Sequence, residues 1–345
     1  MYNIDTDGKG ELIMERLRYL TDYYDEPIRR IKELGAPLNF IFVSDQHHMF
    51  RYSTVEAVES MQYILDRCPE ITCVVSGGDI GNDYDPDPAS FRKTMHDMMN
   101  ALYGLSVPVH CCIGNHDDYI GNCIDHGWDT RNGILPDEMH ALCMKYNPTP
   151  ENYYYTDLDI GEGYRFVFLN TSDKPYLRDD SGQYPLAGWR LEISDRQAAW
   201  FENEALNTTR RILVFSHSPI RNKGIVGSEG APDCIKPYDD LRNGGRVYYH
   251  LKNCRNVIAH LAGHVHYDNV YYDDDLPIVT TFSAYRGRWT QTCIPRQMGT
   301  YTETSFDVVS IKDSAMYLTR FGAGADRAVE LLRTVPTVWS KTYIY

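Results

Sequence analysis

The stretch VPVHCCIGNHD, residues 107–117, joins an apolar run to the polar tetrad Gly114-Asn115-His116-Asp117. The run Val107–Ile113 predicts a buried strand, because it is short and mostly apolar. Four other polar motifs follow apolar runs in the same way: Asp45-Gln46-His47, Gly78-Asp79, His217 and Gly263-His264-Val265-His266. In open α/β folds, ligands bind beyond the carboxyl ends of the strands. We therefore expect the five motifs to meet at one place in the fold.

Strand and helix patterns alternate around these motifs. Strands are predicted at Leu38–Val43, Ile71–Ser76, Arg165–Asn170, Arg211–Ser216 and Val257–Ala262, and helices at Glu11–Leu34, Ser53–Asp66 and Pro88–Tyr103. Alternation of this kind predicts an α/β fold with a largely parallel sheet covered by helices. The region from Tyr267 to Phe321 has alternating strand patterns and predicts a second, more antiparallel sheet. In the first helix, Asp25-Glu26-Pro27 predicts a break, because proline disrupts a helix interior.

A chain of 345 residues is long for one core, yet the motifs run from Asp45 to His266 without an intervening linker. We therefore predict one catalytic domain with additions. Its parts are an N-terminal helical extension over residues 1–37, the catalytic domain over 38–321, and a C-terminal extension over 322–345 that packs on the same domain.

Composition narrows the classes of partner. The formal net charge of −14 argues against a broad surface for nucleic acid, but not against a small phosphorylated substrate. No apolar stretch approaches the length that spans a membrane, so no membrane partner is expected. The nine cysteines are scattered and odd in number, which favours reduced core thiols and a cytoplasmic location. Oligomeric state is left open.

The side chains of the five motifs suit two adjacent metal ions. They include two carboxylates, one amide and five imidazoles: Asp45 and Asp79; Asn115; His47, His116, His217, His264 and His266. That set leaves one histidine for proton transfer. Asp79 is the natural bridge, because one carboxylate can give an oxygen to each ion. The predominance of imidazole favours two divalent transition-metal ions (Mn, Fe or Zn) over Mg. Two-metal sites of this kind hydrolyse phosphoesters.

The pattern D-x-H, G-D, G-N-H-D, H and G-H-x-H resembles the calcineurin-like metallophosphoesterase superfamily. The resemblance implies a four-layer αββα sandwich with two mixed β-sheets and the metal site at the C-terminal ends of the strands. It implies that one ion is held by Asp45, His47, Asp79 and His266, and the other by Asp79, Asn115, His217 and His264. It further implies that a hydroxide, its pKa lowered by the ions, attacks phosphorus while His116 protonates the leaving oxygen.

Departures from the family pattern separate its subgroups. The run Gly78-Asp79-Ile80-Gly81-Asn82-Asp83 lacks the Asp-Arg pair of protein serine/threonine phosphatases, and Asn82 stands where purple acid phosphatases carry a metal-binding Tyr. The acidic net charge disfavours a nuclease. The remaining resemblance is to the broad bacterial group that acts on small phosphodiesters, phosphomonoesters or nucleotide-type substrates. A non-catalytic scaffold of the same fold is the competing class, and the complete set of ligand types argues against it.

Candidates for substrate binding come from loops near the motifs. Arg286 is the first choice, because its neighbours Tyr285 and Trp289 have rings that can stack on a base. Arg178, Tyr84 and Tyr119 are further candidates, as guanidinium groups bind phosphate oxygens and the two tyrosines closely follow ligand motifs. Two long loops, Lys174–Trp189 and Ile220–Leu241, are expected to line the substrate site.

Overall fold

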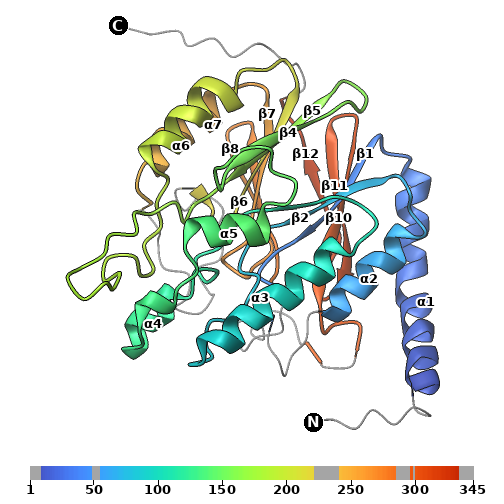
Figure 1. Cartoon of the computed structure of the whole chain (residues 1–345). Coiled ribbons are helices and arrows are strands. Elements are labelled where there is room, and N and C mark those ends of the chain that lie inside the picture. The colour runs from blue at the N-terminus through green and yellow to red at the C-terminus, as the bar shows by residue number, and fades with distance from the viewer. Residues whose placement is uncertain (1–8, 49–54, 221–240, 285–295, 298–299, 334–345) are drawn as a thin grey trace, which may run out of the picture.

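Two six-stranded sheets form the centre of the protein (Figure 1). The computed structural model describes residues 9–48, 55–220, 241–284, 296–297 and 300–333. The first sheet has the order β12-β11-β10-β1-β2-β3, formed by Arg327–Glu330, Ala315–Gly322, Ser305–Lys312, Leu38–Val43, Ile71–Ser76 and Val109–Cys111. The second has the order β4-β5-β6-β7-β9-β8, formed by Tyr154–Leu158, Tyr164–Leu169, Arg211–Ser216, Val257–Ala262, Leu276–Thr280 and Asn269–Asp273.

Both sheets are mixed. In the first, β1, β2 and β3 are parallel, and β10, β11 and β12 extend it in antiparallel pairs. In the second, β5, β6, β7 and β9 are parallel, with β4 and β8 antiparallel at the two edges. Parallel neighbours need crossover connections, which are usually helical, and helices lie between most of these strands in the sequence. Strands β7 and β9 are instead connected through β8.

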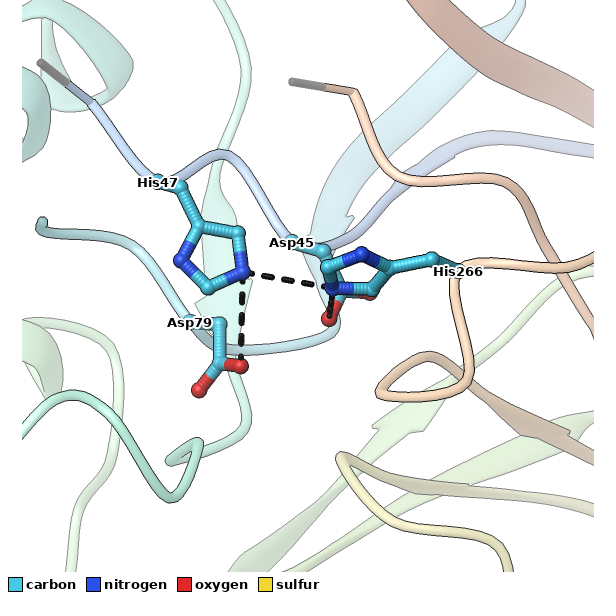
Figure 2. A group of neighbouring side chains, drawn as sticks. All are labelled: Asp45, His47, Asp79 and His266. Carbon is cyan, nitrogen blue, oxygen red and sulfur yellow. Dashed lines mark hydrogen bonds and ion pairs between the residues drawn. The ribbon is translucent and has the colours of Figure 1, made fainter. Parts of the chain in front are cut away.

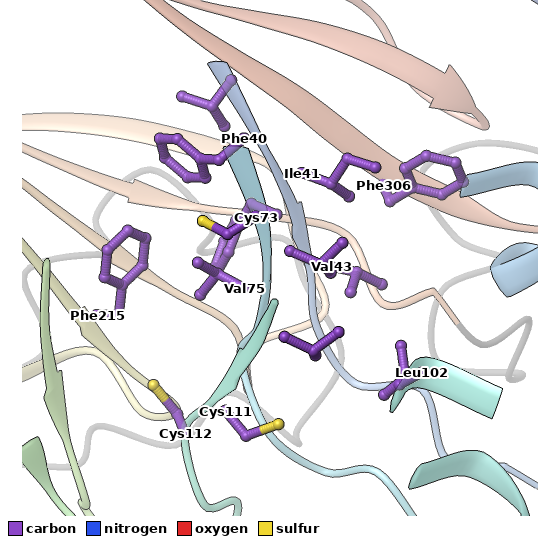
Figure 3. Packing of buried hydrophobic residues seen from close by; sticks show 14 of the residues in the cluster. Phe40, Ile41, Val43, Cys73, Val75, Leu102, Cys111, Cys112, Phe215 and Phe306 are labelled. Carbon is purple, nitrogen blue, oxygen red and sulfur yellow. The ribbon is translucent and has the colours of Figure 1, made fainter. Parts of the chain in front are cut away.

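The space between the sheets is filled by aromatic side chains. Successive residues of a strand point to opposite faces, so Phe40 on β1 faces the second sheet while Ile41 faces the helices (Figure 3). The ring of Phe40 lies 4.9 Å from that of Phe166 and 5.7 Å from that of Phe215. This shared core holds the two sheets together by apolar burial.

Helices cover the outer face of each sheet, which completes the four-layer αββα arrangement (Figure 1). The helices are α1 Lys9–Leu34, α2 Val55–Leu65, α3 Pro88–Tyr103, α4 Ile120–His126, α5 Pro136–Cys143, α6 Asp195–Trp200 and α7 Gly244–Asn253. The first sheet packs against α1, α2 and α3, as shown by Met61 and Met95 in its core cluster. The second sheet packs against α6 and α7, whose Ala198 and Val247 lie in a separate cluster.

The predicted break in the first helix is wrong. Helix α1 runs through Pro27 without interruption, although an interior proline costs roughly 3 kcal/mol. Packing explains the difference, because Tyr24, Ile28 and Ile31 on one face of α1 are buried in the core. The ring of Tyr24 contacts that of Phe321 at 5.0 Å. Tertiary burial therefore overrides the local preference.

The prediction of two sheets is confirmed, but the strands of the Tyr267–Phe321 region do not together form the second one. Strands β8 and β9 complete the second sheet, whereas β10 and β11 join the first sheet beside β1. The C-terminal segment after residue 321 contributes β12 to that same sheet. The strand predicted at Val107–Ile113 is shorter in the structure, with β3 limited to Val109–Cys111. Within the described residues, no helix is both long enough and apolar enough to cross a bilayer.

Candidate metal centre

The five polar motifs follow strands from both sheets. Strands β1, β2 and β3 belong to the first sheet, and β6 and β7 belong to the second. Backbone hydrogen bonds join the loops beyond them: the amide of Asp45 donates to the carbonyl of Gly78 over 2.9 Å, and the amide of Gly263 donates to the carbonyl of His217 over 2.9 Å. The expected convergence of distant strand ends is therefore present.

The backbone of this region is unusually strained. Nine described non-glycine residues have positive φ, and five of them belong to the candidate ligand set: Asp45, His47, Asp79, His264 and His266. Their φ values lie between 41° and 69°, the left-handed region that L-residues rarely adopt. Such conformations persist only where the surrounding structure enforces them, and they concentrate at functional sites.

The first cluster consists of Asp45, His47, Asp79 and His266, whose side chains point toward one another (Figure 2). The Nε2 atoms of His47 and His266 are 3.3 Å apart. His266 Nε2 lies 3.1 Å from an oxygen of Asp45, and His47 Nε2 lies 3.6 Å from Oδ2 of Asp79. Metal–nitrogen bonds of about 2 Å at tetrahedral or octahedral angles place neighbouring ligands about 3 Å apart, so these spacings suit one cation.

The second cluster centres on His217. Its Nε2 lies 3.2 Å from Oδ2 of Asp79, 3.0 Å from Oδ1 of Asn115 and 3.1 Å from Nδ1 of His264. The Nδ1 of His217 is 2.8 Å from the carbonyl oxygen of Gly77 and donates to it. That bond fixes the tautomer, because it leaves the lone pair of Nε2 directed at the other candidate ligands.

Asp79 belongs to both clusters. The amide of His116 donates to its Oδ1 over 3.0 Å, and its Oδ2 faces the histidines. Glycine at position 114 is required for this approach, because a Cβ there would collide with Oδ1 of Asp79. Among the residues predicted from sequence, the structure thus brings all seven candidate ligands together.

The electrostatics of the clusters fit a bound cation. Burial lowers the pKa of His47 and of His264 to about 3, which keeps both imidazoles neutral, as metal ligands must be. At His217, burial opposes protonation, but the carboxylates of Asp79 and Asp45 outweigh it and raise the pKa to about 9. Buried carboxylates that stabilise a proton on a neighbouring histidine can equally stabilise a metal cation in its place. The imidazole-rich donor set is typical of a transition-metal site.

His116 lies beside the clusters and is held by a residue that the sequence analysis did not assign. Its Nδ1 donates to the buried carboxylate of Asp83 over 2.8 Å. Burial disfavours the imidazolium, but Asp83 and Asp79 together raise the pKa of His116 to about 10. Asp83 follows Asp79 by four residues in a loop, where no strand or helix period indicates which side chains face inward.

Asp117 is a second residue that sequence reasoning missed. Its buried carboxylate accepts from the amides of Gly114 and Ile80 at 2.7 Å each, and from the amide of Asp79 at 3.2 Å. Burial and the nearby charge of Asp79 raise its pKa to about 6. It thereby joins the loop after β2 to the loop after β3. The only sequence signal was its place beside His116.

The substrate-binding candidates are dispersed. Tyr84 lies near the centre, with its ring 5.9 Å from that of His116. Tyr119 is buried, stacks on Phe91 and donates its hydroxyl to the backbone of Asp85, so its contacts belong to the core. Arg178 is exposed, and its Nε donates to the hydroxyl of Tyr184 over 2.7 Å. The structure does not describe Arg286, its aromatic neighbours or most of the 220–241 loop.

Two ligand clusters that share one carboxylate at the strand ends of an αββα sandwich define a class, the two-metal hydrolases. A family model described as calcineurin-like phosphoesterase matches residues 38–268. The chain therefore belongs to the calcineurin-like phosphoesterase family and is a metal-dependent phosphoester hydrolase.

One sequence relative and two solved structures are also similar to this chain. The chain is 21% identical over 244 residues to a zebrafish (Danio rerio) protein named manganese-dependent ADP-ribose/CDP-alcohol diphosphatase, covering 58% of this chain and 68% of that protein. A dimetal phosphatase from Danio rerio matches with a TM-score of 0.55 at 15% identity, over 86% of this chain and 99% of that one. GAP50, described as the anchor in the inner membrane complex of Plasmodium, matches with a TM-score of 0.53 at 13% identity. The match covers 87% of this chain and 89% of GAP50.

Proposed function

We propose that this protein hydrolyses a small phosphoester, with His116 as the general acid that protonates the leaving oxygen. The observation that carries the proposal is the partnership of His116 with Asp83 beside two clusters joined by Asp79. A general acid needs a proton and a fixed orientation. The Asp83 carboxylate meets both needs, because it raises the pKa of His116, which keeps the imidazole protonated, and it holds Nδ1 by a hydrogen bond.

The seven candidate ligands divide as the clusters divide. Asp45, His47, Asp79 and His266 are assigned to one divalent ion, and Asp79, Asn115, His217 and His264 to the other. Divalent ions held by these residues would supply an activated water and positive charge for the phosphoryl oxygens. Two side chains have the other roles. The carboxylate of Asp117 orients the backbone of the loops after β2 and β3, and His116 donates the proton to the leaving oxygen.

For the substrate, we favour a phosphodiester or a nucleotide-type diphosphate over a phosphoprotein or nucleic acid. The net charge of −14 and the absence of the Asp-Arg signature after Asp79 support this choice. The zebrafish relative is named as a diphosphatase of ADP-ribose and CDP-alcohols, and this name further supports a nucleotide-type diphosphate as the substrate. The same name favours manganese among the three candidate metals. The role of Arg286 in phosphate binding stays a prediction.

One experiment tests the proposal. The purified protein is loaded with Mn or Zn and assayed on phosphomonoesters, cyclic nucleotides, glycerophosphodiesters, nucleoside diphosphate esters, phosphopeptides and DNA. We expect turnover of a small ester that His116→Ala reduces and His126→Ala, an exposed histidine on α4, does not. Preference for phosphopeptide or DNA contradicts the substrate assignment. If the protein hydrolyses none of these esters, and neither p-nitrophenyl phosphate nor its bis-ester, the result favours the non-catalytic scaffold.

A further inference from the structure

The imidazole of His116 has two aromatic side chains close to it, those of Trp189 and Tyr84. The ring centroid of Trp189 is 4.6 Å from that of His116, at an interplanar angle of 56°. The ring of Tyr84 is 5.9 Å away at 35°. Tyr84 is 53% exposed and Trp189 is partly exposed, while the side chain of His116 retains 17% exposure. A molecule that touches His116 from solvent therefore meets these rings.

Helix α4 fixes the indole of Trp189 in place. Its Nε1 donates to Oδ2 of Asp125 over 2.8 Å. The flat side of the indole lies against Gly121, where an added Cβ would come within 2.5 Å of the ring. A glycine at this point of α4 leaves room for the large side chain. Contacts with α4, the helix that follows the His116 motif, therefore determine where the indole of Trp189 lies.

A buried ion pair holds the loop that carries Trp189. The ammonium of Lys174 is 2.7 Å from Oδ2 of Asp118, and both side chains are almost fully buried. The same ammonium donates to the carbonyl of Gly188, the residue before Trp189, over 2.6 Å. The hydroxyl of Tyr176 also donates to Asp118. Since Asp118 is two residues beyond His116, the indole and the imidazole are anchored to the same segment.

We propose that Trp189, assisted by Tyr84, forms a leaving-group subsite that selects substrates whose leaving group carries an aromatic or heteroaromatic ring. The inference rests on the proposed role of His116. A general acid must contact the leaving oxygen, so the atoms beyond that oxygen lie within reach of rings 4.6 and 5.9 Å from the imidazole. A nucleoside or aryl group there stacks on the indole, whereas a saturated group of equal size gains less.

The test compares two non-hydrolysable ligands that differ in aromaticity. Benzyl phosphonate and cyclohexylmethyl phosphonate, each as the free acid, whose only organic substituent is joined to phosphorus by carbon, are titrated by calorimetry into the metal-loaded protein. We expect the benzyl compound to bind about tenfold more tightly, within the range of one stacked ring. Trp189→Leu is expected to reduce that ratio to about one, Trp189→Phe to keep most of it, and Tyr84→Leu to reduce it less. Tyr249→Leu, an exposed tyrosine on α7, should leave the ratio unchanged.

A second measurement uses the wild-type fold and is independent of whether Trp189→Leu folds. With 5-fluorotryptophan incorporated, the ¹⁹F resonance of Trp189, assigned from Trp189→Phe, is expected to shift with benzyl phosphonate and to move much less with the cyclohexyl analogue. An equal response to both ligands, or a binding ratio unaffected by Trp189→Leu, overturns the subsite. Hydrolysis without ring selectivity contradicts only this inference. Ring-selective binding without hydrolysis of any ester contradicts the proposed function and leaves the subsite standing.

Discussion

Asp83 and His116 are joined by a hydrogen bond of 2.8 Å between Oδ1 and Nδ1, although they lie on loops after different strands. The carboxylate is buried and the imidazole is partly exposed. This asymmetry places the charge inside and the proton donor at the surface. The pair therefore separates two roles, since Asp83 orients and polarises while His116 meets the substrate.

Asp83→Asn should lower turnover of alkyl phosphoesters by roughly tenfold to a hundredfold, because the imidazolium loses its carboxylate partner. His116→Ala should have at least that effect. The loss should be smaller for p-nitrophenyl esters, whose leaving group needs no proton. Steady-state kinetics on both ester types checks this, with Asp85→Asn as the control in the same loop and metal content measured in parallel. Equal losses on alkyl and nitrophenyl esters would assign Asp83 and His116 another role.

Metal stoichiometry should follow the division of the two clusters. The wild-type protein should bind two equivalents of metal. Asp79→Asn should weaken both, because its carboxylate belongs to both clusters, whereas His47→Ala and His217→Ala should each reduce the content toward one. Elemental analysis after dialysis against a fixed free-metal concentration measures this. A wild-type value of one equivalent at saturating metal would contradict the shared bridge.

Gly114→Ala should damage the metal centre although it replaces none of the candidate ligands. The new Cβ would collide with the carboxylate and the amide of Asp79, so Asp79 must move away from the clusters. We expect metal affinity to fall at least tenfold in a metal-binding titration. Gly104→Ala is the matched control, because Gly104 has φ of −80° and lies at the end of α3. If both variants bind metal as the wild type does, the close packing at Gly114 is not required.

The Lys174–Asp118 pair should contribute strongly to stability. Both side chains are buried, and removing one partner of a buried pair leaves an uncompensated charge that costs about 3–5 kcal/mol. Lys174→Met should therefore lower the free energy of unfolding by about that amount in urea titrations. Lys93→Met removes the exposed Lys93–Asp97 pair and should cost under about 1 kcal/mol. Similar small losses in both variants would show that the buried pair adds little.

Stability should decrease as the pH falls below about 6.5. Burial lowers the pKa of His110 to about 4 and that of His260 to about 3, whereas unfolded histidine titrates near 6.5. Between these values the unfolded state binds more protons than the native state, so acid favours unfolding by about 1.4 kcal/mol per pH unit for each histidine. Urea unfolding of the EDTA-treated protein at pH 7.5 and 5.5 measures this. His110→Gln should reduce the difference by about 1.4 kcal/mol, and an unchanged difference would contradict the assignment to His110.

Local elements could be predicted where burial on both faces leaves a strong pattern. Strands Leu38–Val43, Ile71–Ser76, Arg211–Ser216 and Val257–Ala262 have the predicted bounds. Helix α3 has the predicted bounds Pro88–Tyr103, and it begins after Asp87, whose side chain accepts from the amide of Ala89. Ser194 likewise caps α6, where its side chain accepts from the amide of Gln197. Such features depend on residues close in the chain, so the sequence contains their cause.

The reaction class could also be predicted from the sequence, because each ligand motif immediately follows its own strand. The carboxyl ends of parallel strands lie at the same edge of a sheet, so these motifs come together. What only the tertiary structure decided lies between segments far apart in the chain. The assignment of β8–β9 and β10–β11 to different sheets, the continuity of α1 through Pro27 and the approach of Trp189 to His116 are of this kind. Each depends on burial of apolar surface and on pairing of buried charge across long sequence separations, and those energies exist only once the chain has folded.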